Sequence, residues 1–319
     1  MDEDEDEEVR AMADGKRVVV TGATGLIGKD VCNRLRAEGY EVVVFTREPE
    51  RARRAAPGAA DYVAWTPSES GPWAAHIDGA WGVVNLAGAP VAGKRWTEAR
   101  KREIRDSRIV GTRGIVAAIA AAARKPEALV NASAIGYYGP RDDTPLDEAA
   151  PAGHDFLAGV VADWEAEARK AEDAGVRVAL VRTGIVLDKD EGALAQLMLP
   201  YRFFVGGPVL PGTQWFSWIH HLDEAGIVLL ALRDERARGP INATAPEPQT
   251  NRDFSRTLSR VMGRPSLFPV PGVALKLLFG EFAGTLTTGQ RVLPARAQEL
   301  GYKFQYPASE AALRQILAR

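Results

Sequence analysis

Short apolar runs alternate with helical patterns over the first part of the chain. Apolar runs occupy 17–21, 41–45, 82–86, 128–133 and 177–183. Amphipathic stretches with helical spacing occupy 29–38, 97–123 and 157–174. This alternation predicts parallel strands joined by crossover helices, because successive parallel strands need a long connection. We therefore predict an α/β fold with a Rossmann-type doubly wound parallel sheet.

The alternation ends near Asp188. A Gly- and Pro-rich stretch follows at 206–212, and helical patterns return at 251–261 and 309–317. Irregular segments above the carboxyl edge of such a sheet commonly form the substrate pocket. We predict that the C-terminal portion of the chain forms a smaller α/β substrate-side region, and that the whole chain divides into four parts. The parts are a disordered acidic tail (1–15), a nucleotide-binding Rossmann domain (16–187), a substrate-side region interleaved with the Rossmann core (188–266) and a C-terminal family-specific segment (267–319).

The loop between the first predicted strand and the first helix reads Thr-Gly-Ala-Thr-Gly-Leu-Ile-Gly. Gly22 permits the sharp turn, Gly25 lets the backbone approach a diphosphate, and Gly28 allows close packing of helix on sheet. The helix N-terminus then favours the anion through its free N–H groups and its dipole. The loop residues predicted to contact a dinucleotide are Gly22, Thr24, Gly25, Leu26, Ile27 and Gly28.

The second predicted strand ends in Thr46 and Arg47. An NAD-binding loop usually has Asp or Glu here, which accepts hydrogen bonds from the ribose hydroxyls. A guanidinium instead pairs with a 2′-phosphate through charge-assisted hydrogen bonds. We therefore favour NADP(H) over NAD. The alternative is that Arg47 is an ordinary solvated loop residue.

Composition narrows the class of protein further. The formal net charge of the 319 residues is −2, whereas nucleic-acid-binding proteins usually carry a basic surplus, so we expect no nucleic-acid partner. Cys32 is the single cysteine, which rules out an intramolecular disulfide and a cysteine cluster for zinc. The four histidines lack metal spacing, so we expect no metal. No apolar run reaches the length of a membrane span. We predict a soluble intracellular protein, in the cytoplasm, or in an organelle stroma if a targeting peptide has been removed.

Several motifs resemble those of one family. The glycine loop, Asn85-Leu86-Ala87-Gly88 and the strand end at Ser133 are similar to extended short-chain dehydrogenase/reductases, the group that contains sugar-nucleotide epimerases. A narrower resemblance is to the atypical SDR39U1-type epimerase family proteins, NAD-dependent epimerase/dehydratase-like, with a C-terminal domain of unknown function. The motifs that carry it are Lys94-Arg95-Trp96, Ser107-Arg108 and the segments 133–139, 163–165, 214–220 and 289–294.

The resemblance implies further cofactor contacts. Leu86, Ala87 and the adjoining Gly88 would line the adenosine side of the cofactor. Glu103 and Arg108, on the following helix, would reach the same side. Ile185 and Val186, after the strand at 177–183, would lie near the nicotinamide. Each of these residues can instead be read as ordinary packing.

The resemblance also exposes a departure in the catalytic residues. Reductases of this superfamily use a Ser and a Tyr-x-x-x-Lys pair, in which the lysine lowers the tyrosine pKa so that the phenol exchanges a proton. Counted back from Glu165, those positions hold Leu157 and Val161, which transfer no proton. Ser133 and Tyr138 are the candidates that remain for catalysis, although a phenol without a nearby cation is a slow acid–base group at neutral pH. Asp163 is the third candidate and is more typical of a solvated or capping residue.

The segment at 214–220 is the best candidate for a substrate pocket. Trp215 and Trp218 offer flat apolar faces, while Gln214 and His220 can orient a ligand by hydrogen bonds. Lys94 can meet an acidic group on the ligand. The alternative is that these aromatic residues seal the C-terminal segment onto the main domain.

Two functions from different classes remain open. One is an NADP(H)-dependent oxidoreductase or epimerase-like enzyme acting on a carbonyl or sugar-like substrate. The other is an NADP(H)-binding scaffold or redox sensor with little or no turnover, acting through a protein partner. The apolar faces of the C-terminal segment fit either closure of a substrate cleft or docking of a partner chain, including a second copy.

Overall fold

The central element is a seven-stranded sheet in the order β11-β7-β5-β4-β1-β2-β3. The computed structural model describes residues 15–68 and 70–318, so the predicted acidic tail lies outside the described residues except for Gly15. All pairings in the sheet are parallel. The strands are β1 (Arg17–Thr21), β2 (Glu41–Thr46), β3 (Asp61–Ala64), β4 (Gly82–Asn85), β5 (Ala128–Ala134), β7 (Arg177–Thr183) and β11 (Gly239–Ala243). The predicted α/β fold with a doubly wound parallel sheet is confirmed.

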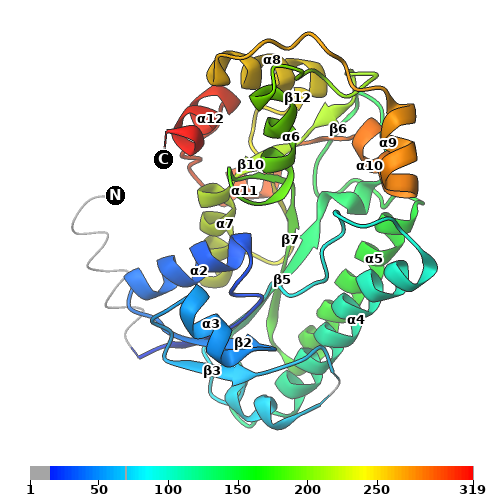
Figure 1. Cartoon of the computed structure of the whole chain (residues 1–319). Coiled ribbons are helices and arrows are strands. Elements are labelled where there is room, and N and C mark those ends of the chain that lie inside the picture. Colours follow the sequence, from blue (N-terminus) through cyan, green and yellow to red (C-terminus); the bar gives the residue numbers. More distant parts are fainter. Residues whose placement is uncertain (1–14, 69, 319) are drawn as a thin grey trace.

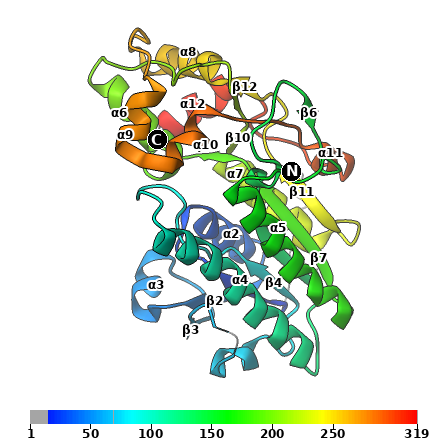
Figure 2. The same ribbon diagram turned by 90° about the vertical axis from the view of Figure 1, so that its right-hand side faces the viewer.

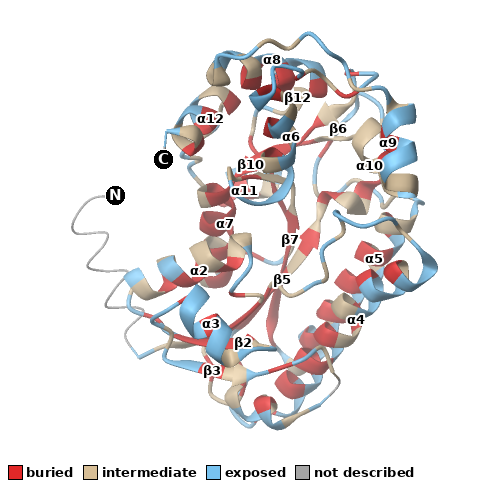
Figure 3. Cartoon of the chain, in the orientation of Figure 1, coloured by how far each residue is buried: buried red, intermediate tan, exposed pale blue. Residues whose placement is uncertain are grey.

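Helices cover both faces of this sheet (Figure 1). One layer contains α2 (Leu26–Ala37) and α7 (His221–Arg233), and the other contains α4 (Glu98–Ala121) and α5 (Phe156–Arg169). Because successive strand residues point to opposite faces, Val18 and Val20 enter one core cluster and Val19 enters the other. This burial on both faces explains the unbroken apolar run in β1. Figure 3 shows the buried residues concentrated along the strands and the inner sides of these helices.

The chain order reverses between β1 and β4. From β1 the sheet continues to β2 and β3 on one side and to β4, β5 and β7 on the other. In open α/β sheets, ligands bind outside the carboxyl ends of the strands at such a switch point. The glycine loop that follows β1 therefore lies where a cofactor is expected.

A third core cluster joins the smaller second part of the molecule, around Trp218, Phe254 and Leu313. Figure 2 shows α6, α8, α9 and α12 gathered at one end, away from α3 and β3. The remaining elements are α3 (Pro49–Ala55), β6 (Pro145–Leu146), β8 (Ile185–Leu187), α6 (Gly192–Arg202), β9 (Trp215–Phe216), β10 (Trp218–His220), β12 (Gln249–Thr250), α8 (Asn251–Met262), α9 (Gly272–Phe279), α10 (Ala283–Thr287), β13 (Arg291–Val292), α11 (Ala295–Glu299) and α12 (Ser309–Leu317).

The predicted C-terminal segment, 267–319, packs against widely separated parts of the chain. Strand β13 pairs in parallel with β6, α11 packs against β11, and α12 packs against α8. Helix α9 is different, because it leaves most of its surface exposed (Figure 3). The segment therefore contacts both the central sheet and the region at 188–266.

Candidate functional site

The glycine loop is folded tightly between β1, β4 and α2. Gly22 has φ +68°, and a Cβ there would lie 2.8 Å from the carbonyl carbon of Leu86. A Cβ on Gly28 would lie 2.2 Å from the Gly22 carbonyl oxygen. Both positions therefore exclude a side chain. Gly25 differs, since its Cβ would meet nothing closer than the Gly22 oxygen at 3.4 Å. The protein leaves space at Gly25 that it does not itself fill.

The N-terminus of α2 is open beside that space. No side chain caps Gly25, the residue before the helix. The first backbone hydrogen bond of the helix runs from the Lys29 N–H to the Gly25 oxygen, at 3.1 Å. The N–H groups of Leu26, Ile27 and Gly28 precede it and have no acceptor within the helix. Their arrangement next to an open glycine fits the diphosphate of a dinucleotide.

The end of β2 supplies the predicted basic group. Arg47 is exposed, and the Thr46 hydroxyl accepts a hydrogen bond from the Glu48 N–H at 3.3 Å. The neighbouring carboxylate, Glu48, lies 3.7 Å from the guanidinium of Arg51. The segment from the end of β2 to the first turn of α3 therefore carries two guanidinium groups, of which that of Arg51 has a carboxylate beside it.

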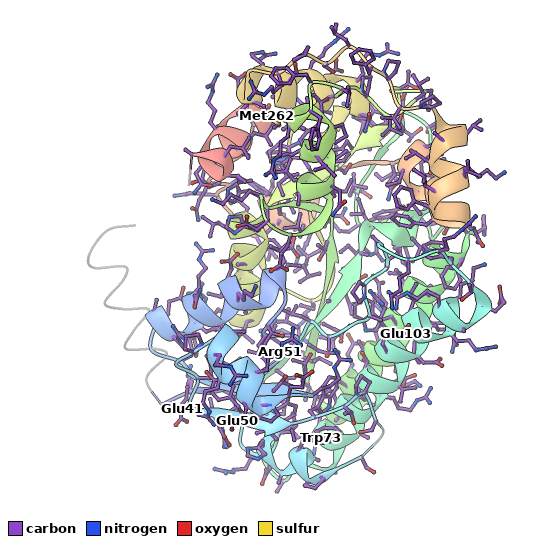
Figure 4. The ribbon with its side chains drawn as sticks, viewed as in Figure 1. Glu41, Glu50, Arg51, Trp73, Glu103 and Met262 are labelled. Carbon is purple, nitrogen blue, oxygen red and sulfur yellow. The ribbon has the colours of Figure 1, made fainter. Side chains whose placement is uncertain are left out.

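Glu103 faces the same region from α4. Its carboxylate accepts a hydrogen bond from Arg100 at 2.6 Å, and this bond holds the pKa of Glu103 below its usual range, with smaller contributions from the charges of Lys94 and Arg47. The electrostatic influence of Arg47 and Lys94 places these three charged groups in one neighbourhood. Figure 4 shows Arg51 on α3 to the left of Glu103 on α4.

Residues after β4 are held by a chain of polar side chains. The N–H groups of Leu86 and Ala87 both donate to the Thr21 hydroxyl at 3.1 Å, and that hydroxyl donates to Asn85 at 2.7 Å. Asn85 in turn donates to Asn131 on β5 at 2.6 Å. The carboxyl ends of β1, β4 and β5 are thereby locked in register, which fixes the wall on which Leu86 and Ala87 lie.

Arg108 supports the next residues of that wall. Its guanidinium donates to the Ala89 and Ile104 carbonyls, each at 3.0 Å, and a Cβ on Gly88 would approach it to 3.0 Å. Burial lowers the pKa of Arg108 to about 10. The structure therefore places Arg108 against Gly88, with its side chain mostly covered by protein.

Ser133 and Tyr138 lie in a buried hydrogen-bond network. Ser133 donates to Glu165 at 2.6 Å, and Arg182 donates to both oxygens of Glu165 at 2.8 and 2.9 Å. The Tyr138 hydroxyl accepts from Arg182 at 2.9 Å and donates to Asn242 at 2.7 Å. Tyr138 is 0% exposed, and its burial raises the pKa of the phenol to about 12. Both hydroxyls are engaged inside the protein, and their predicted catalytic role stays a prediction.

Helix α5 supplies no replacement for the missing acid–base pair. Val161 is buried, and the Leu157 side chain lies against Gly136. Asp163, the third candidate, is exposed and forms an ion pair with Arg105 of α4 at 3.0 Å. Its contacts are those of a surface residue that joins two helices.

The residues predicted for the substrate pocket separate into two groups. Trp218 and His220 are both 0% exposed. Trp218 belongs to the third core cluster, and His220 accepts from the Leu222 N–H at the start of α7 while its other ring nitrogen lies 2.8 Å from Gln315. These two residues pack between the C-terminal region and the rest of the protein. Their predicted role in substrate binding stays a prediction.

Gln214 and Trp215 line a cavity of about 870 Å³. Its walls also include Arg141, Asp143 and Thr288. The Trp215 indole donates to Asp143 at 2.9 Å, and Arg291 covers the ring at 4.7 Å. The Gln214 side-chain oxygen is buried without a hydrogen-bond partner in the described chain. The cavity therefore combines an aromatic wall with charged and amide groups. Lys94 is exposed and does not line it.

The sequence patterns did not single out two buried charged side chains. Arg182 lies within the apolar strand β7, and Glu224 lies within the largely apolar helix α7. A charged residue inside an apolar run is the signal that could have singled them out. Ile185 and Val186, predicted beside the nicotinamide, are half-buried in β8.

The part of the chain that the structure describes shows no group of three or more His, Cys, Asp or Glu side chains arranged to hold a metal ion. Over the same residues, no helix has both the length and the apolar character needed to cross a membrane.

Comparisons with known proteins agree with this geometry. Residues 18–243 match the NAD dependent epimerase/dehydratase family, and residues 270–316 match the domain of unknown function DUF1731. Among relatives, the chloroplastic epimerase family protein SDR39U1 homolog of Arabidopsis thaliana is 44% identical over 302 residues, 94% of this chain and 86% of that protein. Epimerase family protein SDR39U1 of Mus musculus is 36% identical, over 95% of this chain and 100% of its own length.

A solved structure is similar over nearly the whole chain. The crystal structure of human epimerase family protein SDR39U1 (isoform 2) with NADPH has a TM-score of 0.86 and 34% identity, and the match covers 95% of this chain and 99% of that one. These matches confirm the resemblance drawn from the sequence motifs. The chain belongs to the NAD-dependent epimerase/dehydratase family and, within it, to the SDR39U1-type epimerase family proteins that carry the C-terminal domain of unknown function.

Proposed function

We propose that this protein binds NADP(H) at the glycine loop and acts as an NADP(H)-dependent oxidoreductase or epimerase-like enzyme on a carbonyl or sugar-like substrate. The observation that carries the proposal is Arg47 at the end of β2, beside an open helix N-terminus. A guanidinium at that place complements a 2′-phosphate, whereas NAD would leave it unpaired. The human relative solved with NADPH supports the same cofactor.

The chain's own residues divide the binding of such a cofactor between them. The N–H groups at 26–28 would hold the diphosphate, and Arg47 with Arg51 would hold the 2′-phosphate. Leu86 and Ala87 would cover the adenosine, and Ile185 and Val186 would border the nicotinamide. When bound, the cofactor supplies hydride chemistry. The cavity beside Gln214 and Trp215 supports a polar ring-shaped substrate, because Trp215 offers a flat face and Arg141 and Asp143 offer charged partners.

Arg47→Ala tests the cofactor. We expect the affinity for NADPH to fall by roughly tenfold to a hundredfold, because a charged hydrogen bond contributes about 1.5–3 kcal/mol. The affinity for NADH should not change, since NADH has no 2′-phosphate. Titration of the two cofactors by fluorescence measures both affinities.

Arg54→Ala is the matched control, because Arg54 is an exposed arginine in the last turn of α3, the helix that follows Arg47. It should leave both affinities within about twofold of the original values. Equal losses of NADPH and NADH affinity in Arg47→Ala would contradict recognition of the phosphate.

The scaffold or redox sensor is the second candidate. It is favoured by the buried network that engages Ser133 and Tyr138 and by the apolar positions Leu157 and Val161. A screen of carbonyl compounds and nucleotide sugars, followed by NADPH absorbance, separates the two functions. Turnover that is lost in Trp215→Ala supports the enzyme. Tight NADPH binding without turnover of any compound supports the scaffold.

A further inference from the structure

One buried carboxyl of α7 lies next to the carboxyl end of β7. Glu224 is 1% exposed and belongs to the first turn of the helix. One of its oxygens accepts a hydrogen bond from the Thr183 hydroxyl at 2.7 Å, and the other, Oε2, has no hydrogen-bond partner in the described chain. A buried carboxyl with one oxygen unsatisfied lowers the stability of the fold, so its presence needs a physical reason.

The other charged and titratable groups around α7 are engaged elsewhere. On the side of α2, His221 bonds to Asp30, Arg34 donates to the Leu222 carbonyl, and Lys29 pairs with Glu191. On the C-terminal side, Asp223 accepts from Tyr302, Gln305 and Tyr306, and His220 of β10 contacts Gln315. On β7, Arg177 donates to carbonyls at the end of α7, and Arg182 pairs with Glu165 on the opposite face of the sheet. Burial raises the pKa of Glu224 to about 8, and the Thr183 hydrogen bond offsets that rise only in part. Glu224 can therefore change its charge near neutral pH.

Thr183 connects this carboxyl to the proposed nicotinamide site. It is the last residue of β7, is half-buried, and precedes Ile185 and Val186 by two and three positions. Val186, Ile27 and Leu86 are all partly buried against the core cluster to which α7 contributes. These three residues belong to β8, the start of α2 and the loop after β4. Helix α2 follows β1, and β1 and β4 flank the switch point of the sheet.

We propose that Glu224 couples proton binding to the redox state of the bound cofactor: its carboxyl is protonated beside NADPH and ionised beside NADP⁺, with Thr183 as the contact between the two. The inference rests on the proposed function, since it requires a nicotinamide at this site. Exchange of NADPH for NADP⁺ would release the proton to solvent, and no other bond changes.

Electrostatics gives the direction of the coupling. The oxidised nicotinamide ring carries a positive charge and the reduced ring carries none. In a buried site a positive ring stabilises a nearby carboxylate and lowers its pKa. The Thr183 hydroxyl donates to Glu224 when the carboxyl is ionised, and it can accept from Glu224 when the carboxyl is protonated. Whether the Thr183 hydroxyl acts as a donor or as an acceptor toward Glu224 thus depends on the charge of Glu224, and this decides which hydrogen bond it can offer to the ligand.

Linkage then fixes the expected pH dependence. At low pH Glu224 is neutral with either cofactor bound, so protonation gives no preference. As pH rises through the pKa of Glu224, the carboxylate forms more readily with NADP⁺ bound, and the affinity for NADP⁺ rises relative to that for NADPH. A pKa difference of about one unit between the two complexes gives a tenfold change in the affinity ratio.

The experiment measures the dissociation constants of NADPH and NADP⁺ for the full chain from about pH 6 to about pH 10, a window that brackets a raised carboxyl pKa. Their ratio cancels the titration of the 2′-phosphate, which both cofactors carry. The wild-type ratio should change about tenfold, and Glu224→Gln should make it independent of pH. Glu191→Gln removes an exposed carboxyl that pairs with Lys29 of α2, and it should keep the wild-type slope.

Calorimetry of the wild-type protein in two buffers with different ionisation enthalpies measures the number of protons taken up or released when a cofactor binds. This measurement needs no variant. Near pH 8, binding of NADPH should take up more protons than binding of NADP⁺. Equal proton exchange, or a slope that persists in Glu224→Gln, would overturn the assignment. Failure to bind either cofactor would instead refute the proposed function, and the coupling with it.

Discussion

Arg182→Met should destabilise the protein by about 3–5 kcal/mol, the usual cost of removing one partner of a buried ion pair. Arg182 is 2% exposed and donates to both oxygens of Glu165. Its loss would leave the Glu165 carboxylate buried, with only Ser133 donating to it within the described chain. Methionine has a similar length, so the lost charge dominates over the lost volume. Chemical denaturation monitored by circular dichroism measures the change in unfolding free energy.

Arg105→Met is the matched control for that measurement. Arg105 forms an ion pair with Asp163 at 3.0 Å, but both side chains are about half exposed. Exposed pairs contribute about 0–1 kcal/mol because water screens them. A cost for Arg182→Met no larger than that for Arg105→Met would show that the buried network does not stabilise the fold. The double change Arg182→Met with Glu165→Leu should recover part of the loss, because no charge then stays buried without its partner.

The same network shows why the surroundings of Ser133 and Tyr138 could not be predicted from sequence patterns. Both residues were singled out because they lie at or just after the end of the strand predicted at 128–133, which the structure contains as β5. Ser133 bonds to Glu165, and Tyr138 bonds to Arg182 and Asn242, and all of these partners lie far away in the sequence. Side-chain hydrogen bonds between distant strands depend on sheet order, which hydrophobic periodicity does not contain.

The main features of the sheet could be predicted because they are local. Apolar runs buried on both faces, such as β1, stand out from amphipathic helices such as α4. The pairing of β13 with β6 and the docking of α12 on α8 could not be predicted. The helical patterns of α8 and α12 were recognisable, but not which helix packs against which. The two-residue strands β6 and β13 are stabilised by contacts with distant parts of the chain, so their own sequences carry little signal.

The candidate site also contains a part that could be predicted from local sequence and a part that could not. The glycine loop is recognisable because its spacing is dictated by backbone geometry within a few residues. The aromatic segment at 214–220 was recognised, but its first two residues line the cavity and the others are buried. Trp215 lines the cavity whereas Trp218 is buried. Their spacing alone cannot show which aromatic face meets a ligand, because either can seal a domain or bind a ring.

Gly25→Ala should lower the affinity for NADPH by about tenfold to a hundredfold, the effect of losing a charged hydrogen bond to the diphosphate. The new Cβ would occupy the space beside the open N-terminus of α2, where the diphosphate is proposed to bind. Fluorescence titration measures the affinity. The stability of the protein without cofactor should change by less than about 1 kcal/mol, because that Cβ would meet only the Gly22 oxygen, at 3.4 Å.

Gly28→Ala separates a binding effect from a folding effect. Its Cβ would lie 2.2 Å from the Gly22 oxygen and 2.7 Å from the Ala23 Cα, both backbone atoms that cannot turn away. This variant should therefore lose stability even without cofactor, by about 1–3 kcal/mol for overpacking, which thermal unfolding detects. If Gly25→Ala instead lost as much stability as Gly28→Ala, Gly25 would be needed for the fold. If it kept full NADPH affinity, the space above Gly25 would not be where the diphosphate binds, and the proposed cofactor site would have to be moved.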